Sequence, residues 1–224
     1  MGALSALKRG IFGIQFNIPA AWQMAKDEET HLELADTEKG VQWHFFFFPD
    51  LHMDISKAAQ PYLAASLPAY ARLMFEQVFP VLNADNPKAE PRTKDPAWSP
   101  LVDVEYVTVG GAPALRTIHR MAYQPGREIH LGHVLVPLKR GLFEARVVTT
   151  DSFTGGRECV VMLKTDRDAG AGETTIPPQA QMDDPKYDAS FPEHCLSRAR
   201  AALQWFTLES GALVRGAGCQ PSAA

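Results

Sequence analysis

Histidines are the first candidates for catalytic or metal-binding residues in this chain, because imidazole serves both as a general base and as a metal ligand. Seven are present, and His119, His130 and His133 form the densest group, on two β-rich runs joined by a short turn. If Tyr123 pairs with Glu128, His119 lies diagonal to His130 on one face and His133 points to the other. A metal site needs three or four ligands. The spacing therefore predicts no metal, and His119 with His130 is a candidate pocket pair.

The remaining reactive side chains are isolated in the sequence. His31, His44, His52 and His194 stand singly on expected elements, where a hydrogen-bonded, half-buried imidazole is the usual role. Cys195 follows His194, but neighbours on a helix diverge by about 100° and cannot form a thiolate–imidazole pair. No G-x-S-x-G elbow or phosphate-binding glycine motif occurs. These patterns predict a protein without catalytic residues and without a cofactor.

Aromatic residues are concentrated in one segment. Trp43 precedes an uninterrupted run of four phenylalanines, Phe45 to Phe48. Core packing is the simpler interpretation, since aromatic side chains dominate cores as readily as interfaces. The alternative is an apolar groove on one face of a sheet that receives a peptide or helix. On that alternative Trp43, Phe45 and Phe47 are candidate binding residues, together with His119 and His130.

Composition limits the classes of partner. The net charge is −4, and no run of Lys or Arg exceeds two residues, whereas nucleic-acid binding needs clustered basic charge. Three scattered cysteines suit a reducing compartment better than a disulfide framework. No stretch approaches the ~20 apolar residues that span a bilayer. We expect a cytoplasmic protein that binds no nucleic acid and does not insert stably into a membrane.

Alternating apolar residues and turn residues predict an α+β fold with an antiparallel sheet of about six to seven strands flanked by helices. One domain is expected over residues 1–224, with its core at about 11–208. The expected strands are 11–18, a hairpin of 30–35 and 41–48, and a meander of 101–109, 114–123, 128–138 and 142–150.

The other expected segments are helices and loops. One amphipathic helix begins at Asp54 and runs through Val78, and a final helix begins at Ser190, whose spacing to Glu193 matches a capping box. Leu196, Ala199, Leu203 and Phe206 form the apolar stripe of that last helix. Proline and glycine content predicts an irregular connection at 83–100, a mobile loop at about 166–188 and a frayed tail at 211–224.

Two short motifs resemble known families. An early F-x-x-P-x-x-W phrase and a later G-x-P-A-x-R phrase are similar to phrases of the PsbP-like and DcrB-like families. Their residues here are Phe16, Pro19 and Trp22, then Gly111, Pro113, Ala114 and Arg116. The resemblance implies an α/β/α sandwich and a non-catalytic binding, assembly or chaperone module. Some DcrB-like proteins are chaperones that hold apolar helices of type VI secretion effectors.

Three hypotheses of function follow. The first is a cytoplasmic protein-binding, chaperone or adaptor module with a protein partner, which the resemblance links to bacterial secretion. The second is a small-ligand-binding protein or hydrolase that uses a pocket at His119 and His130. The third is a structural subunit of a larger assembly, for which a homodimer is the simplest form.

Overall fold

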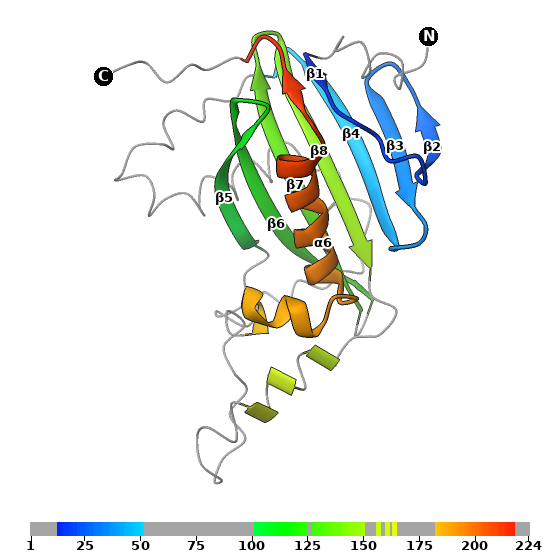
Figure 1. Ribbon diagram of the computed structural model, residues 1–224, viewed down its shortest axis with the longest axis vertical. Helices are drawn as coiled ribbons and strands as arrows, with labels where there is room; N and C mark the ends of the chain where they lie inside the picture. The colour runs from blue at the N-terminus through cyan, green and yellow to red at the C-terminus, as the bar shows by residue number, and fades with distance from the viewer. Residues whose placement is uncertain are drawn as a thin grey trace, which may run out of the picture.

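A seven-stranded antiparallel sheet organises the chain in the computed structural model, which describes residues 13–51, 101–124, 127–150, 156–157, 160–161, 163–164 and 182–217. Its strand order is β2-β3-β4-β8-β7-β6-β5 (Figure 1). The strands are β2 (Gln23–Asp27), β3 (His31–Asp36), β4 (Val41–Pro49), β5 (Leu101–Val109), β6 (Ala112–Gln124), β7 (Arg127–Leu138) and β8 (Gly141–Thr150). The predicted α+β class, hairpin and meander are confirmed.

Helix α6 (Cys195–Gln204) continues into a π-helical turn, η4 (Trp205–Glu209), and packs across one face of the sheet (Figure 1). Its predicted apolar stripe is confirmed, since Leu196, Ala199, Leu203 and Phe206 are all buried. Gly132 lets the helix approach β7 closely, because a Cβ there would lie 2.7 Å from Leu203 Cδ1. Among the described residues no helix has the length and apolar character to cross a bilayer.

Only one face of the sheet has a described helix packed against it. Cross-strand register puts Trp43 and Phe45 of β4 on the α6 face, and His44 and Phe46 on the opposite face. The predicted helix from Asp54 to Val78 and the connection at 83–100 lie outside the described residues. The sheet with a helix on one face is therefore shown, whereas helices on both faces remain a prediction.

The strand predicted at 11–18 is shorter in the structure, which describes it from residue 13. Among residues 13–18 only Ile14–Gln15 (β1) lies in a ladder, and it pairs with β9 (Leu213–Val214) in a small second sheet. The alternation of apolar residues in this segment reflects burial of every second side chain, since Ile14 and Phe16 are core residues. Strand β2 had no signal in the sequence, because an edge strand is held by backbone hydrogen bonds to one neighbour and needs no apolar pattern.

The start of the last helix also differs from the prediction. Ser190 ends a 3₁₀ helix, η3 (Pro185–Ser190), and α6 begins at Cys195 with His194 as its N-cap. His194 Nδ1 accepts a hydrogen bond from the Leu196 amide at 3.2 Å. Pro192 lies between the two helices and lacks the amide that would continue one helix through it.

The predicted mobile loop is structured in its described part. Residues 185–188 belong to η3, and Asp188 accepts from Arg157 at 2.6 Å and from Arg200 at 3.1 Å. Arg157 is buried, so its ion pair with Asp188 holds η3 against residue 157. The contact of Asp188 with Arg200 holds η3 against α6. Residues 166–181 lie outside the described residues. The tail predicted to fray from residue 211 contains β9, while residues 218–224 are likewise outside.

Candidate functional site

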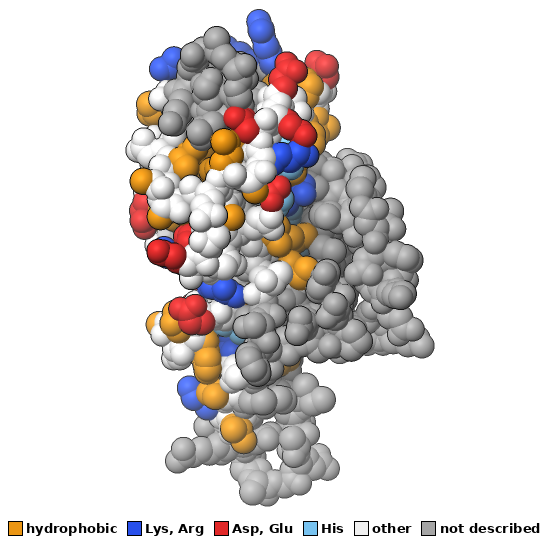
Figure 2. All heavy atoms as spheres, turned by 90° about the vertical axis from the view of Figure 1, so that its right-hand side faces the viewer, with side chains coloured by type: hydrophobic (Ala, Val, Ile, Leu, Met, Phe, Trp, Pro, Cys, Tyr) orange, Lys and Arg blue, Asp and Glu red, His pale blue; other side chains and the backbone are white. Residues whose placement is uncertain are grey.

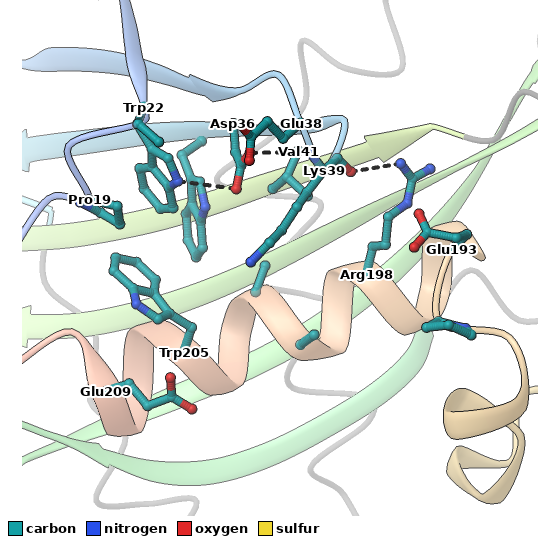
Figure 3. A pocket seen from close by; sticks show the side chains of 15 residues that line it. Pro19, Trp22, Asp36, Glu38, Lys39, Val41, Glu193, Arg198, Trp205 and Glu209 are labelled. Carbon is teal, nitrogen blue, oxygen red and sulfur yellow. Dashed lines mark hydrogen bonds between the residues drawn. The ribbon is translucent and has the colours of Figure 1, made fainter.

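A cavity of about 540 Å³ lies where the β3–β4 turn, the chain before β2 and helix α6 meet (Figure 3). Three tryptophans from these three places line it: Trp22, Trp43 and Trp205. The other lining residues are charged, small or proline: Pro19, Ala21, Asp36, Glu38, Lys39, Val41, Pro192, Glu193, Arg198, Ala201, Ala202 and Glu209. A concave, largely apolar cavity of this size is typical of a small-ligand site.

The three indoles pack against one another. Trp22 stacks on Trp43 with ring centroids 5.8 Å apart, and Trp205 lies 4.8 Å from Trp22 and 5.8 Å from Trp43. Aromatic pairs at such separations contribute about 0.5–1.5 kcal/mol beyond their area burial. Trp43 is 1% exposed, whereas Trp22 and Trp205 are half-buried. Trp43 is therefore the floor, and the other two present ring surface to whatever enters.

The β3–β4 turn fixes one wall. Asp36 accepts from Trp22 Nε1 at 3.2 Å and from the Lys39 amide at 3.1 Å, so one carboxylate holds both an indole and the turn. Arg198 of α6 donates to the Lys39 carbonyl at 2.8 Å. Gly40 permits this contact, since it has a φ of +59° and a Cβ there would lie 2.6 Å from the guanidinium. Helix, turn and indole are thus positioned together.

The charged side chains that line the cavity point in different directions. The Lys39 side chain runs across the cavity toward α6, and Glu209 points away from Trp205 (Figure 3). Among the described residues no carboxylate pairs with the Lys39 ammonium, while Asp36 is already engaged by two donors. The cavity therefore combines indole surface with four carboxylates and two cations, of which Arg198 already donates to the Lys39 and Thr150 carbonyls.

The predicted aromatic residues do not form an open groove on the sheet. Helix α6 covers their face, because Phe45 is 2% exposed and lies against Phe206 at a centroid distance of 6.0 Å. Phe47 is half-buried and packs on the same core. Trp43 alone of the three lines the cavity. Sequence reasoning did not select Trp22, Trp205 or Lys39 as site residues, because only the packing of α6 on the turn brings them together.

The predicted pairing of His119 with His130 is wrong. Ala122 pairs with Glu128, and the register shifts between Ala122 and Gln124, so one residue is skipped relative to the expected hairpin. A shift of one residue moves a side chain to the other face of a sheet. His119 and His130 consequently lie on opposite faces and cannot act together on one substrate in a shared pocket.

Each of these histidines has a different neighbour from the one expected. His119 lies edge-on to His133, with ring centroids 5.5 Å apart. His130 Nδ1 lies 2.9 Å from Cys195 Sγ under the N-terminus of α6, and both residues are about 1% exposed. Cys195 is the first residue of α6, so this buried contact joins the start of the helix to β7.

A buried charge network lies on the face opposite α6. Glu144 is fully buried and accepts from Arg146 Nε at 2.7 Å and from His133 Nδ1 at 2.8 Å. Burial alone would raise the pKa of Glu144, but the His133 hydrogen bond and the Arg146 charge together lower it below 4.5. Burial also lowers the pKa of His133 below 6.5, against the pull of Glu144. The network is a neutral imidazole and an ion pair under the sheet surface.

Comparison with known proteins gives only a distant resemblance in fold. No family model matches the chain, and no curated protein matches it. A crystal structure from Bacteroides thetaiotaomicron VPI-5482 is 8% identical with a TM-score of 0.34, over 63% of this chain and 40% of that one. LpqN of Mycobacterium tuberculosis, described as involved in cell envelope biogenesis, is 11% identical with a TM-score of 0.30, over 69% and 78%. Neither confirms the PsbP-like or DcrB-like family.

Proposed function

We propose that this chain is a non-catalytic binding protein whose ligand enters the tryptophan-lined cavity between the β3–β4 turn and α6. The observation that carries the proposal is the composition of the lining: three indoles and a rim of charged side chains that includes Lys39, with no Ser, Thr, Cys, Tyr or His. Nucleophilic catalysis by a hydroxyl, thiol or imidazole needs such a group next to a base, and the lining supplies none of these groups. The indole surface favours recognition of an apolar group.

The ligand class follows from the positions of Trp22, Trp205 and Lys39. Half-buried indole faces favour a flat or branched apolar group, which loses contact with water on entering. The Lys39 ammonium favours an anionic head next to that group. An apolar body with a carboxylate or sulfonate fits both features. Such chemistry belongs to a small apolar acid or to the C-terminus of a protein partner that ends in an apolar residue.

The distribution of surface charge agrees with a ligand that is not a nucleic acid. Figure 2 shows acidic and basic side chains interspersed on the face at the β2 edge of the sheet. Binding along a phosphate backbone would need basic residues gathered on one surface. The sparse cysteine content supports a cytoplasmic location as part of the proposal.

Two dyes test the cavity directly. 1-Anilinonaphthalene-8-sulfonate carries an apolar body and an anionic head, and N-phenyl-1-naphthylamine has the same body without the charge. We expect fluorescence titration to show both dyes binding, with the sulfonate about threefold weaker in Lys39→Gln because an exposed charge pair contributes up to about 1 kcal/mol. The neutral dye is expected to be unaffected by Lys39→Gln. Trp22→Ala is expected to weaken both dyes about tenfold.

Matched controls separate the cavity from general surface binding. Lys186→Gln removes an exposed lysine outside the cavity and is expected to leave both dyes unchanged. Competition by peptides ending in Leu or Trp, each with a free or an amidated C-terminus, then separates a protein partner from a small acid. The proposal fails if Trp22→Ala and Lys39→Gln bind both dyes like the wild type while their circular dichroism is unchanged.

We also propose the α/β/α sandwich of the PsbP-like and DcrB-like kind as the finer description of the fold. Its support is the place of the motif residues. Pro19 and Trp22 stand at the cavity just before β2, and Gly111, with a φ of +82°, occupies the β5–β6 turn. An experimental structure that lacks a helix on the second sheet face would contradict it.

A further inference from the structure

Strands β3 and β4 bring three metal-ligating side chains together on the face opposite α6. His31 Nε2 lies 3.2 Å from His44 Nδ1, and His44 Nδ1 lies 3.8 Å from Glu33 Oε2. All three ligand atoms lie within 4.8 Å of one another. The two histidines are 13 residues apart in the chain and were expected to stand alone; the register of the hairpin places Glu33 opposite His44 and His31 two residues away.

The spacing of these atoms matches a small first-row ion. Zinc bonds to imidazole nitrogen at about 2.0–2.1 Å and to carboxylate oxygen at about 2.0–2.2 Å in a tetrahedron. Two ligand atoms of such a tetrahedron stand about 3.3–3.5 Å apart. The observed 3.2 Å and 3.8 Å bracket that edge, and the third pair of ligand atoms lies within 4.8 Å, so side-chain rotations would bring the three atoms to one centre.

The residues around His31, Glu33 and His44 are also compatible with metal binding. Gln42 donates to Glu33 Oε1 from across the hairpin, which leaves Oε2 directed at the histidines. The cation nearest to His44 in the sheet, Arg146, is held by Glu144 at 2.7 Å, so its charge is largely compensated. Glu33 and His44 each keep 18% of their side-chain surface exposed, which gives an ion a route from solvent.

The facing nitrogens fix how each ring would bind. An imidazole binds a metal ion through one ring nitrogen while the other carries the proton. His31 Nε2 and His44 Nδ1 face each other here, so each ring would carry its proton on the nitrogen that points away from the ion.

We propose that His31, Glu33 and His44 form a binding site for a divalent transition-metal ion, with Zn²⁺ the best match to the two nitrogen donors and one oxygen donor. Water completes the fourth position. The site lies on the face of the sheet opposite α6, so it is separate from the tryptophan-lined cavity and independent of the function proposed there.

Titration with Co²⁺ and Zn²⁺ tests this site. Co²⁺ added to the metal-free protein is expected to give the intense visible absorption of a four-coordinate ion at one equivalent, and Zn²⁺ is expected to displace it. His44→Ala is expected to abolish that band, and Glu33→Gln, which can keep the contact with Gln42, is expected to weaken Zn²⁺ binding at least tenfold. Zn²⁺ is also expected to raise the melting temperature of the wild type and not that of His44→Ala.

A histidine elsewhere provides the matched control. His194→Asn removes one imidazole while retaining a favoured N-cap side chain for α6, and it is expected to bind Co²⁺ like the wild type. Circular dichroism of each variant shows whether it is folded. If His44→Ala does not fold, Glu33→Gln still tests the site. Wild-type Co²⁺ spectra of a six-coordinate ion, or equal Zn²⁺ affinity in Glu33→Gln and the wild type, would overturn the proposal.

Discussion

Replacing Glu144 with glutamine is expected to destabilise the protein far more than the same change at Glu105. Both carboxylates pair with an arginine, but Glu144 is fully buried and Glu105 keeps 53% of its side chain exposed. Glu144 accepts two hydrogen bonds from Arg146, at 2.7 and 3.2 Å, and one from His133 at 2.8 Å. After Glu144→Gln a neutral amide faces a guanidinium that is only 12% exposed.

The magnitude follows from burial. Removing one partner of a buried ion pair costs about 3–5 kcal/mol, whereas an exposed pair contributes about 0–1 kcal/mol. We therefore expect Glu144→Gln to lower the free energy of unfolding by about 3–5 kcal/mol and Glu105→Gln by less than about 1 kcal/mol. Urea unfolding at pH 7, followed by tryptophan fluorescence, measures both. Equal losses in the two variants would refute the assignment of Glu144 to a buried, energetically coupled network.

Three further outcomes are expected. Stability should fall as the pH drops from 7 to 4, because the lowered pKa values of His133, His44 and His31 make the unfolded chain take up protons first below 6.5, and the lowered pKa of Glu144 adds to this loss below 4.5; urea midpoints at pH 7, 5.5 and 4 measure it, and His133→Gln should reduce the loss between pH 7 and 5.5. Gly132→Ala should cost about 1–3 kcal/mol by overpacking, since its Cβ would lie 2.6 Å from a side-chain atom of β8; a melting temperature equal to that of the wild type would contradict the close approach. Arg157→Met should cost about 3 kcal/mol by removing a buried partner of Asp188, and hydrogen exchange should show earlier opening of η3.

Local patterns were sufficient for the elements that alternate or turn sharply. The meander and the β3–β4 hairpin follow from β-rich runs separated by glycine turns, and the stripe from Leu196 to Phe206 follows from helical spacing. Elements held by backbone pairing alone carried no such pattern. Strand β2 is the example, since its side chains are mostly exposed and its ladder to β3 is made of main-chain hydrogen bonds.

Tertiary structure decided the register of β6 on β7, and this register determines whether the two predicted histidines lie on the same face of the sheet. The bulge at residue 123 carries no distinctive residue type, yet it moves His119 to the face opposite His130. Only a one-residue change separates the two arrangements, because side chains alternate strictly across a strand. The energy that selects one register comes from packing over the whole sheet, which no local window contains.

By itself the sequence determined the fold class, the positions of most strands along the chain and the apolar face of the last helix, because these depend on periodicity and turn residues close together in the chain. Tertiary structure alone decided both candidate sites. Trp22, Trp43 and Trp205 meet because α6 packs on the β3–β4 turn, and His31 meets His44 through the register of one hairpin. Such sites depend on contacts between distant residues, whose geometry is set by the packing of the complete core.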